Sequence, residues 1–281
     1  MDLMQPLKKA IRIFRSQIYV LRGRQPWRYG YTDYKGKQIA LALANPDLLS
    51  TFKNNQSLPL QYSQRLDERL VEFPWIITHL PSTAGRVLDA GSTINFDYIL
   101  NQSVWQKQDI TIMTLAPEDK SFWQKRISYV YGDLRNVPFR ENWFDTITCI
   151  STLEHVGMNN DIYTADATFH EADTTSHLTV IDEFKRILKP GGKLYLTVPY
   201  GIFKLCGFQQ VFNADMIQAI KTRFGGKTVQ ETYFRYSADG WQMASATECD
   251  QSDYFDIHVT KQYAADYAAA ARAVACLILE K

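Results

Sequence analysis

Residues 86–95 read Arg-Val-Leu-Asp-Ala-Gly-Ser-Thr-Ile-Asn, a short apolar strand that runs into Asp89 and a turn at Gly91. Glycine at such a turn lets the backbone approach a ligand closely. A second stretch, residues 188–199, reads Leu-Lys-Pro-Gly-Gly-Lys-Leu-Tyr-Leu-Thr-Val-Pro. It contains the end of a helix, a Pro-Gly-Gly turn and another buried strand. The two stretches therefore predict two strands of one sheet, with a ligand-binding turn after the first.

Between and beyond these stretches, strand and helix signals alternate, which predicts a parallel sheet covered on both faces. We expect strands at 86–90, 110–114, 128–131, 145–151, 193–198, 228–236 and 274–279. Helices are expected over 177–188 and from Asn213 to Gly225, which supply an N-terminal cap and a C-terminal stop. Upstream, one helix starts at Asn45-Pro46-Asp47 and another spans 64–72, ended by Phe73-Pro74. The run from Ala264 to Ala271 favours a helix by propensity.

In order and spacing, four segments resemble the class I S-adenosylmethionine-dependent methyltransferases, in particular the small-molecule, type 11-like group. They are residues 86–95, Tyr131-Gly-Asp-Leu134, Phe144 to Val156, and 188–199. The resemblance implies an α/β, Rossmann-like sheet of seven strands, mostly parallel with an antiparallel C-terminal strand and helices on both faces. It further implies a methyltransferase domain over 81–281, with core motifs in 86–201. Residues 1–80 would then form an N-terminal helical extension and cap.

The resemblance also implies where S-adenosylmethionine binds, since family members hold it with residues that follow the strand ends. In this chain those residues are Asp89, Gly91, Ser92, Asn95, Thr114, Leu115, Asp133, Leu134, Ser151 and Glu154. Family members commonly end the second strand with an acid that binds the ribose, but here Thr114 and Leu115 stand in its place. Glu118 and Asp119 are the nearest acids in the following loop. We expect a valine at Gly91 to leave the fold intact and to block cofactor binding.

His155 is the candidate catalytic residue, because imidazole is suited to remove a proton near neutral pH. The alternative is that His155 only orients a loop, with positioning of the reactants supplying most of the rate. The polar stretch 157–177 is too long for a simple connection and is typical of a lid or substrate loop. Its His170, Glu171, Asp173 and His177 match no tetrahedral metal motif, so no metal is predicted.

Composition excludes several classes of function. The chain has 281 residues and a formal net charge of +1, which argues against nucleic acid as the main partner. Four cysteines lie far apart, and Cys149 and Cys276 fall in apolar runs that predict burial. This usage favours a reducing, cytoplasmic setting. No apolar run reaches the length of a membrane span.

The N-terminal residues 3–21 predict an amphipathic helix. Leu3, Leu7, Ile11, Phe14, Ile18 and Leu21 form one apolar stripe, and it is surrounded by Lys8, Lys9, Arg12, Arg15, Arg22 and Arg24. One interpretation is peripheral contact with an anionic membrane through residues 3–21. The other, which the sequence favours, is a helix packed on its own domain or on a partner subunit.

The sequence thus predicts an enzyme that transfers a methyl group from S-adenosylmethionine to a small-molecule or glycan-type acceptor. Within the same fold, the alternative is a catalytically degenerate methyltransferase-like binding protein. A nicotinamide-dependent oxidoreductase is disfavoured, because the G-x-G-x-x-G pattern and the acid about twenty residues later are both absent.

Overall fold

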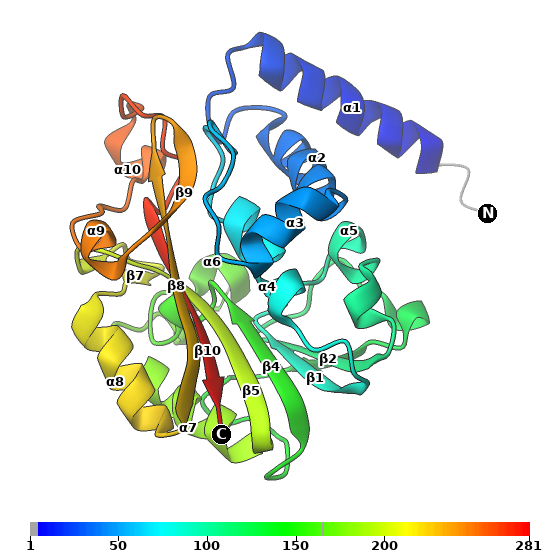
Figure 1. The fold of residues 1–281 in the computed structure, drawn as a ribbon, viewed down its shortest axis with the longest axis vertical. Helices are drawn as coiled ribbons and strands as arrows, with labels where there is room; N and C mark the ends of the chain where they lie inside the picture. Colours follow the sequence, from blue (N-terminus) through cyan, green and yellow to red (C-terminus); the bar gives the residue numbers. More distant parts are fainter. Residues whose placement is uncertain (1–4, 165) are drawn as a thin grey trace.

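The computed structural model describes residues 5–164 and 166–281, which form one central sheet flanked by helices (Figure 1). The eight strands lie in the order β3-β2-β1-β4-β5-β10-β8-β9. They are β1 (Gly85–Ala90), β2 (Gln108–Thr114), β3 (Ser128–Tyr131), β4 (Phe144–Ile150), β5 (Leu188–Pro199), β8 (Lys227–Ser237), β9 (Gly240–Ala244) and β10 (Ala273–Glu280). A separate pair joins β6 (Lys204–Leu205) to β7 (Gln210–Val211).

Strand directions confirm the predicted class of sheet. Strands β1 to β5 pair in parallel, and β10 runs antiparallel between β5 and β8. All seven predicted strands are present, but β9 makes the count eight instead of seven. The extra strand pairs with β8 in a hairpin whose turn lies between Ser237 and Gly240.

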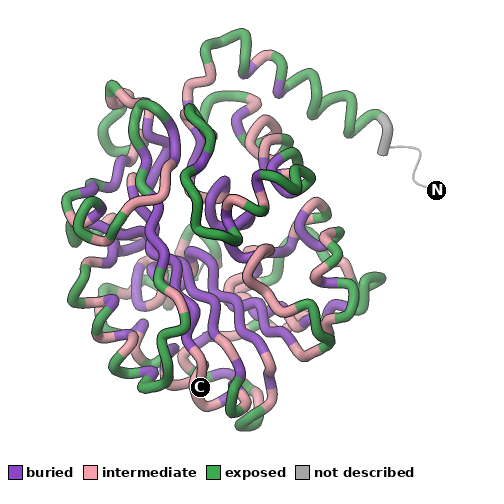
Figure 2. Tube along the Cα trace, viewed as in Figure 1, coloured by how far each residue is buried: buried purple, intermediate pink, exposed green. Residues whose placement is uncertain are grey.

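Helices cover both faces of the sheet. They are α1 (Gln5–Leu21), α2 (Tyr31–Leu43), α3 (Pro46–Lys53), α4 (Arg69–His79), α5 (Asp97–Leu100), α6 (Asp161–Thr164), α7 (His177–Ile187), α8 (Ala214–Phe224), α9 (Ala246–Cys249) and α10 (Ile257–Thr260). Successive residues of a strand point to opposite faces. Accordingly, Val87 belongs to the same buried cluster as Trp75 of α4, and Leu88 belongs to the cluster that contains Phe184 of α7. Buried residues therefore run through the middle of the molecule (Figure 2).

Several local predictions from the sequence are confirmed. The Asn45 side chain accepts hydrogen bonds from the backbone N–H groups of Asp47 and Leu48 at the start of α3. Asn213 accepts one from the N–H of Met216 and so begins α8, which ends at Gly225 in the left-handed conformation. Cys149 and Cys276 are buried free thiols.

The helix predicted over 64–72 lies elsewhere, because α4 spans Arg69–His79 and contains Pro74 in its interior. A proline there has no N–H to offer the carbonyl four residues earlier. That carbonyl belongs to Leu70, and it accepts instead from the hydroxyl of Tyr62 at 2.6 Å. The aromatic side chain from outside the helix thus satisfies the group that proline leaves open, and α4 continues through Pro74.

The alanine-rich run from Ala264 to Ala271 is not helical, so the propensity-based prediction is wrong. Ala268 to Ala271 are buried, and their backbone bonds to distant parts of the chain. The carbonyl of Ala269 accepts from the indole N–H of Trp27, and that of Ala270 from the N–H of Phe255. Small side chains allow this close passage, and tertiary contacts outweigh a weak local preference.

Most of helix α1 projects from the body of the molecule (Figure 1). It contacts α2, and its buried residues are Ser16 and Tyr19, neither of which belongs to the apolar stripe. Leu3 of that stripe lies outside the described residues. Within the described part of the chain, no helix is long and apolar enough to cross a membrane.

Candidate active site

A cavity of about 370 Å³ opens at the carboxyl ends of β1 to β4. In an open α/β sheet this edge is where ligands bind. Its lining includes eight residues that the sequence predicted for the site: Gly91, Ser92, Thr114, Leu115, Asp133, Leu134, Ser151 and His155. Asp89, Asn95 and Glu154 lie behind the wall. Sequence reasoning missed Arg69, Phe96, Thr152, Tyr163 and Phe169, which also line the cavity.

The turn after β1 is fixed by Asp89. Its carboxylate is fully buried and accepts hydrogen bonds from the N–H of Ile94 (3.1 Å) and the hydroxyl of Thr148 (2.9 Å). Burial raises the pKa of Asp89 to about 7, although both hydrogen bonds oppose the shift. Asp89 therefore ties β1, its turn and β4 together, and it does not face the cavity.

Gly91 and Ser92 follow with positive φ angles of 107° and 64°, in a region that favours glycine. A Cβ on Gly91 would stand 2.0 Å from Oγ1 of Thr152, so glycine is required for packing against the loop after β4. The earlier expectation that a larger residue there would only fill the ligand's path is therefore wrong. The hydroxyl of Ser92 is buried at the cavity wall and has no hydrogen-bond partner among the described residues.

Glu118, in the loop after β2, lines the cavity. Its carboxylate accepts from the amide nitrogen of Asn95 at 2.7 Å, and that amide also bonds to the carbonyl of Lys120 at 3.1 Å. The amide oxygen of Asn95 accepts from the hydroxyl of Tyr129 at 2.9 Å. Asn95 thus holds the loop after β2 against the sheet and positions Glu118.

Asp133, after β3, is engaged by Arg135. The guanidinium contacts Asp133 at 2.6 Å and Glu171 of the 157–177 loop at 2.6 Å, so it links that loop to the strand end. Burial opposes ionisation of Asp133, but hydrogen bonds from the side chain and N–H of Arg135 outweigh it and lower the pKa. The carboxylate of Asp133 remains charged at the cavity wall.

Ser151, at the end of β4, donates its hydroxyl to Glu72 of α4 at 2.5 Å. Glu72 is fully buried, accepts from the hydroxyl of Thr197 as well, and pairs with Arg69 on its own helix. Arg69 reaches the cavity. Burial opposes its charge, yet the neighbouring carboxylates raise the pKa of Arg69, so this guanidinium stays cationic.

His155 and Glu154 lie in the short 3₁₀ helix η3 (Leu153–His155). The Nδ1 of His155 bonds to the carbonyl of Phe208 at 2.7 Å, and the ring packs between Tyr163 and Phe208. A carbonyl only accepts, so Nδ1 carries the proton and Nε2 keeps its lone pair. Burial lowers the pKa of His155 to about 4. Burial also raises the pKa of Glu154 well above its usual range, so Glu154 is a neutral acid beneath the site.

The 157–177 loop covers one side of the cavity with Asn160, Tyr163 and Phe169. It contains α6 and the 3₁₀ helix η4 (Ala167–Phe169), so the predicted lid has structure of its own. Over residues 5–164 and 166–281, no group of three histidine, cysteine or acidic side chains is arranged to hold a metal.

Comparisons with known proteins agree with this architecture. Residues 109–196 match the family model described as a methyltransferase domain. No curated protein matches the sequence. Three solved structures share low sequence identity with the chain. A proposed sarcosine dimethylglycine methyltransferase from Galdieria sulphuraria is 17% identical over 59% of this chain and 63% of its own length, with a TM-score of 0.40.

The second is the 1,6-didemethyltoxoflavin-N1-methyltransferase of Burkholderia thailandensis, with 1,6-didemethyltoxoflavin and S-adenosylhomocysteine bound. It is 14% identical over 86% of this chain and 88% of its own, with a TM-score of 0.47. The third, the N-methyltransferase NodS of Bradyrhizobium japonicum, is 14% identical over 71% and 88%, with a TM-score of 0.40. The family match over residues 109–196 and the strand order agree with the predicted methyltransferase class and with S-adenosylmethionine as its cofactor.

Proposed function

We propose that this S-adenosylmethionine-dependent methyltransferase acts on a small-molecule or glycan-type acceptor in the cavity at the strand ends. The supporting observation is the lining of that cavity, which includes the glycine turn, the Glu118 carboxylate and the Ser92 hydroxyl that has no partner among the described residues. We assign residues 81–281 to the methyltransferase domain. Residues 1–80 form a cap that contributes Arg69 to the cofactor side of the cavity.

Three groups at the wall fit the cofactor chemically. The Glu118 carboxylate can accept both ribose hydroxyls, in place of the acid that β2 lacks. Ser92 donates to the methionine carboxylate, because its buried hydroxyl has no partner in the part of the chain that is described. Arg69 supplies a positive charge to the same carboxylate, since among the described residues only its Nη1 has a side-chain partner, Glu72.

His155 is proposed to orient the acceptor. The bound cofactor supplies an electrophilic methyl group, and the protein must place a nucleophilic atom against it. With Nδ1 bonded to Phe208, the lone pair of Nε2 can accept the hydrogen of an acceptor O–H or N–H group. A neutral imidazole with a pKa of about 4 accepts this hydrogen bond throughout the neutral range, but it is a weak base. Positioning is therefore its larger contribution.

A protein that binds the cofactor without turnover is the second candidate. One observation favours it: the Asp133 carboxylate, which the resemblance assigns to cofactor binding, already accepts from Arg135. Calorimetric titration with S-adenosylhomocysteine, S-adenosylmethionine and a nicotinamide nucleotide tests the cofactor assignment. We expect heat from the first two alone, and no binding at millimolar concentration in folded protein would contradict the proposal. A screen of amines, phenols and sugars as acceptors then distinguishes the two candidates. An enzyme releases S-adenosylhomocysteine with one of them, whereas a protein that only binds the cofactor does not.

A further inference from the structure

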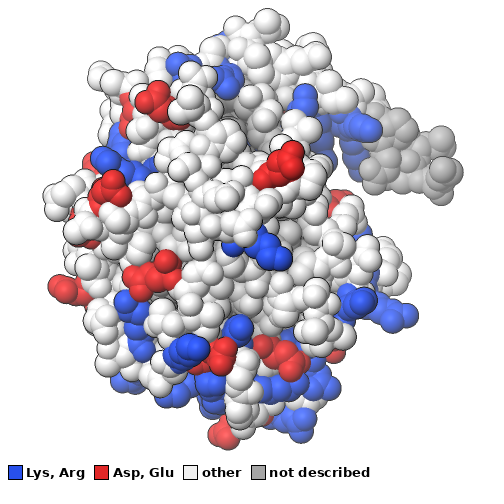
Figure 3. Space-filling view, in the orientation of Figure 1, with Lys and Arg blue, Asp and Glu red and all other residues white. Residues whose placement is uncertain are grey.

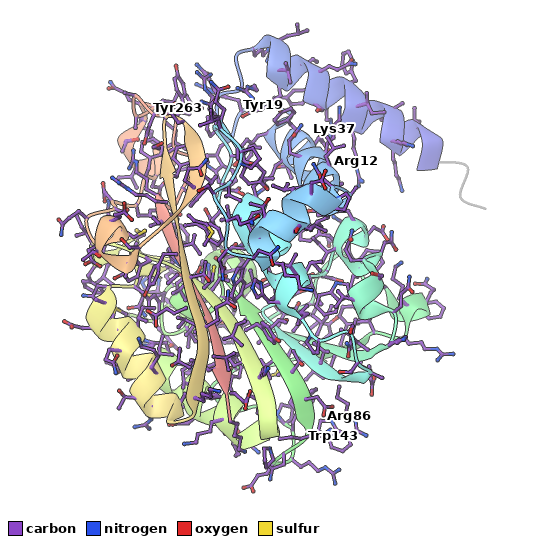
Figure 4. The ribbon with its side chains drawn as sticks, in the orientation of Figure 1. Arg12, Tyr19, Lys37, Arg86, Trp143 and Tyr263 are labelled. Carbon is purple, nitrogen blue, oxygen red and sulfur yellow. The ribbon has the colours of Figure 1, made fainter. Side chains whose placement is uncertain are left out.

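Helix α1 presents its apolar stripe to solvent. Tyr19, which is 1% exposed, and the buried Ser16 are the residues that face the body of the protein. At 100° per residue they lie across the helix from Leu7, Phe14 and Leu21, whose exposed fractions are 56%, 59% and 86%. Figure 4 places Tyr19 at the inner end of α1 and Arg12 beside α2 and its Lys37. The packed-helix interpretation favoured by the sequence does not account for this stripe.

Exposure of such an apolar stripe to water is energetically unfavourable. Ile11 is also exposed, so the outward arc of α1 carries large apolar side chains over about four turns, and exposed Ile13 and Val20 lie on one flank of the helix. Isolated apolar residues on a surface need no explanation, but a contiguous row marks an interaction site. The row implies that another apolar phase or surface covers it.

The charges beside the stripe identify that surface. Lys8, Arg15 and Arg22 each follow a stripe residue at seven-residue steps, so they lie along one edge of the stripe, where Arg15 also pairs with Asp33 of α2 at 4.0 Å. Residues 5–32 contain no acid, whereas the whole chain has a net charge of only +1. In Figure 3, blue Lys and Arg side chains lie at the upper right, beside the N-terminal part of α1. An apolar face bordered by cations is the pattern of a helix that lies in the surface of an anionic membrane.

A second copy of the chain is a poorer occupant. The stripe advances in steps of four and three from Leu7 to Leu21, which would suit a coiled-coil seam. Pairing in either direction needs opposite charges along the seam, but the far edge of the stripe carries Ala10 and Gln17 and no acid. Two such helices would bring cations together without compensation.

We propose that α1 docks on anionic phospholipid, with the stripe in the interface and the cations at the headgroups. The proposal is independent of the assigned methyl transfer. Its test is sedimentation of the full chain with vesicles of phosphatidylcholine containing about one third phosphatidylserine, compared with pure phosphatidylcholine. We expect binding to the first alone, and a steep loss of binding between about 0.05 and 0.5 M salt.

Two variants with matched charge changes locate the contact. Phe14→Asp should lower the partition coefficient about 100-fold, because it removes a large apolar side chain and adds a negative charge. Val259→Asp makes the same kind of change at another exposed position, 76% exposed on α10, and should leave binding unchanged. Lys8→Gln and Arg22→Gln should each reduce binding about fivefold. All four should bind S-adenosylhomocysteine like the wild type, whichever acceptor the enzyme uses.

Several results would overturn the proposal. Equal binding to neutral vesicles would remove the role of charge, and a wild type that ignores both vesicles would exclude lipid. In the latter case, sedimentation equilibrium showing a dimer that Phe14→Asp dissociates would assign the stripe to a second copy. A melting temperature lowered by Phe14→Asp and not by Val259→Asp would assign it to the protein's own core.

Discussion

The two walls of the cavity are built in different ways. The wall formed by β1 and β4, the buried wall, is held by buried hydrogen bonds between Thr148 and Asp89 and between Ser151 and Glu72. The opposite wall, the surface wall, is held nearer the surface, where Asn95 positions Glu118 and Arg135 joins Asp133 to the covering loop. Glu118 and Asp133 line the cavity from the second wall, whereas Asp89 and Glu72 lie behind the first wall and maintain its shape.

Gly91→Ala, in the buried wall, should have the largest effect among the variants that test this contrast. We expect a loss of about 3 kcal/mol or more in the free energy of unfolding. The added Cβ would stand 2.0 Å from Thr152, at a φ of 107° that alanine rarely adopts. Urea denaturation measures the loss.

Gly132→Ala is the matched control, since Gly132 also lines the cavity but belongs to the other wall. A Cβ there meets only the end of the Met113 side chain, at 3.3 Å. This variant should change stability by less than about 1 kcal/mol. Equal losses in the two variants would show that the walls do not differ in tolerance.

Replacing His155 tests whether the buried wall contributes a group to the reaction. On an acceptor found by the screen, His155→Ala should lower turnover about 100-fold while S-adenosylhomocysteine affinity stays near the wild-type value. His170→Ala, on the exposed part of the covering loop, is the control. Because burial lowers the pKa of His155 to about 4, turnover of the wild type should not change through a histidine titration between about pH 6 and 8. A step near pH 6.5 that disappears in His155→Ala would instead make His155 a general base with an ordinary pKa.

Glu118→Gln tests the surface wall by ligand affinity. Loss of a charge-assisted hydrogen bond costs about 1.5–3 kcal/mol, so S-adenosylhomocysteine should bind about 10- to 100-fold more weakly. Asp119→Asn removes the same charge from the neighbouring residue, which does not line the cavity, and should bind normally. Asn95→Ala should weaken binding without touching the ligand, since it frees Glu118 from its anchor. An unchanged affinity in Glu118→Gln would place the ribose elsewhere.

The sequence predicted strands and cavity edge well because both follow from local patterns. Alternating apolar strands and capped helices placed seven strands to within a few residues, and residues after the strand ends necessarily share one edge. It failed where distant contacts decide the outcome. The hydroxyl of Tyr62 donates to the carbonyl that Pro74 cannot pair with, and Trp27 and Phe255 donate hydrogen bonds to the backbone of the alanine run. Arg69 was missed for the same reason, since nothing near it in sequence indicates that α4 reaches the cavity.

The last prediction concerns the protonation of Asp89 in the buried wall. Its pKa is raised to about 7 by burial, whereas an unfolded aspartate titrates near 4. Between these values the folded protein binds more protons than the unfolded one, so stability falls as pH rises from about 4 to 7. The contribution of one carboxyl is at most about 1.4 kcal/mol per pH unit. Burial also raises the pKa of Glu68 to about 7, which makes stability fall with pH in the same direction. The contribution of Asp89 is therefore obtained by comparing the pH dependence of stability in the wild type and in a variant.

Asp89→Asn provides that difference. We expect the variant to be less stable at every pH, because an amide cannot accept from both Ile94 and Thr148. Its stability should nevertheless fall less steeply than that of the wild type between about pH 4 and 7. Urea denaturation at intervals across that range measures both slopes. Parallel curves would mean that Asp89 is ionised in the folded protein, and the buried wall would then hold a charge of its own, as the surface wall does at Asp133.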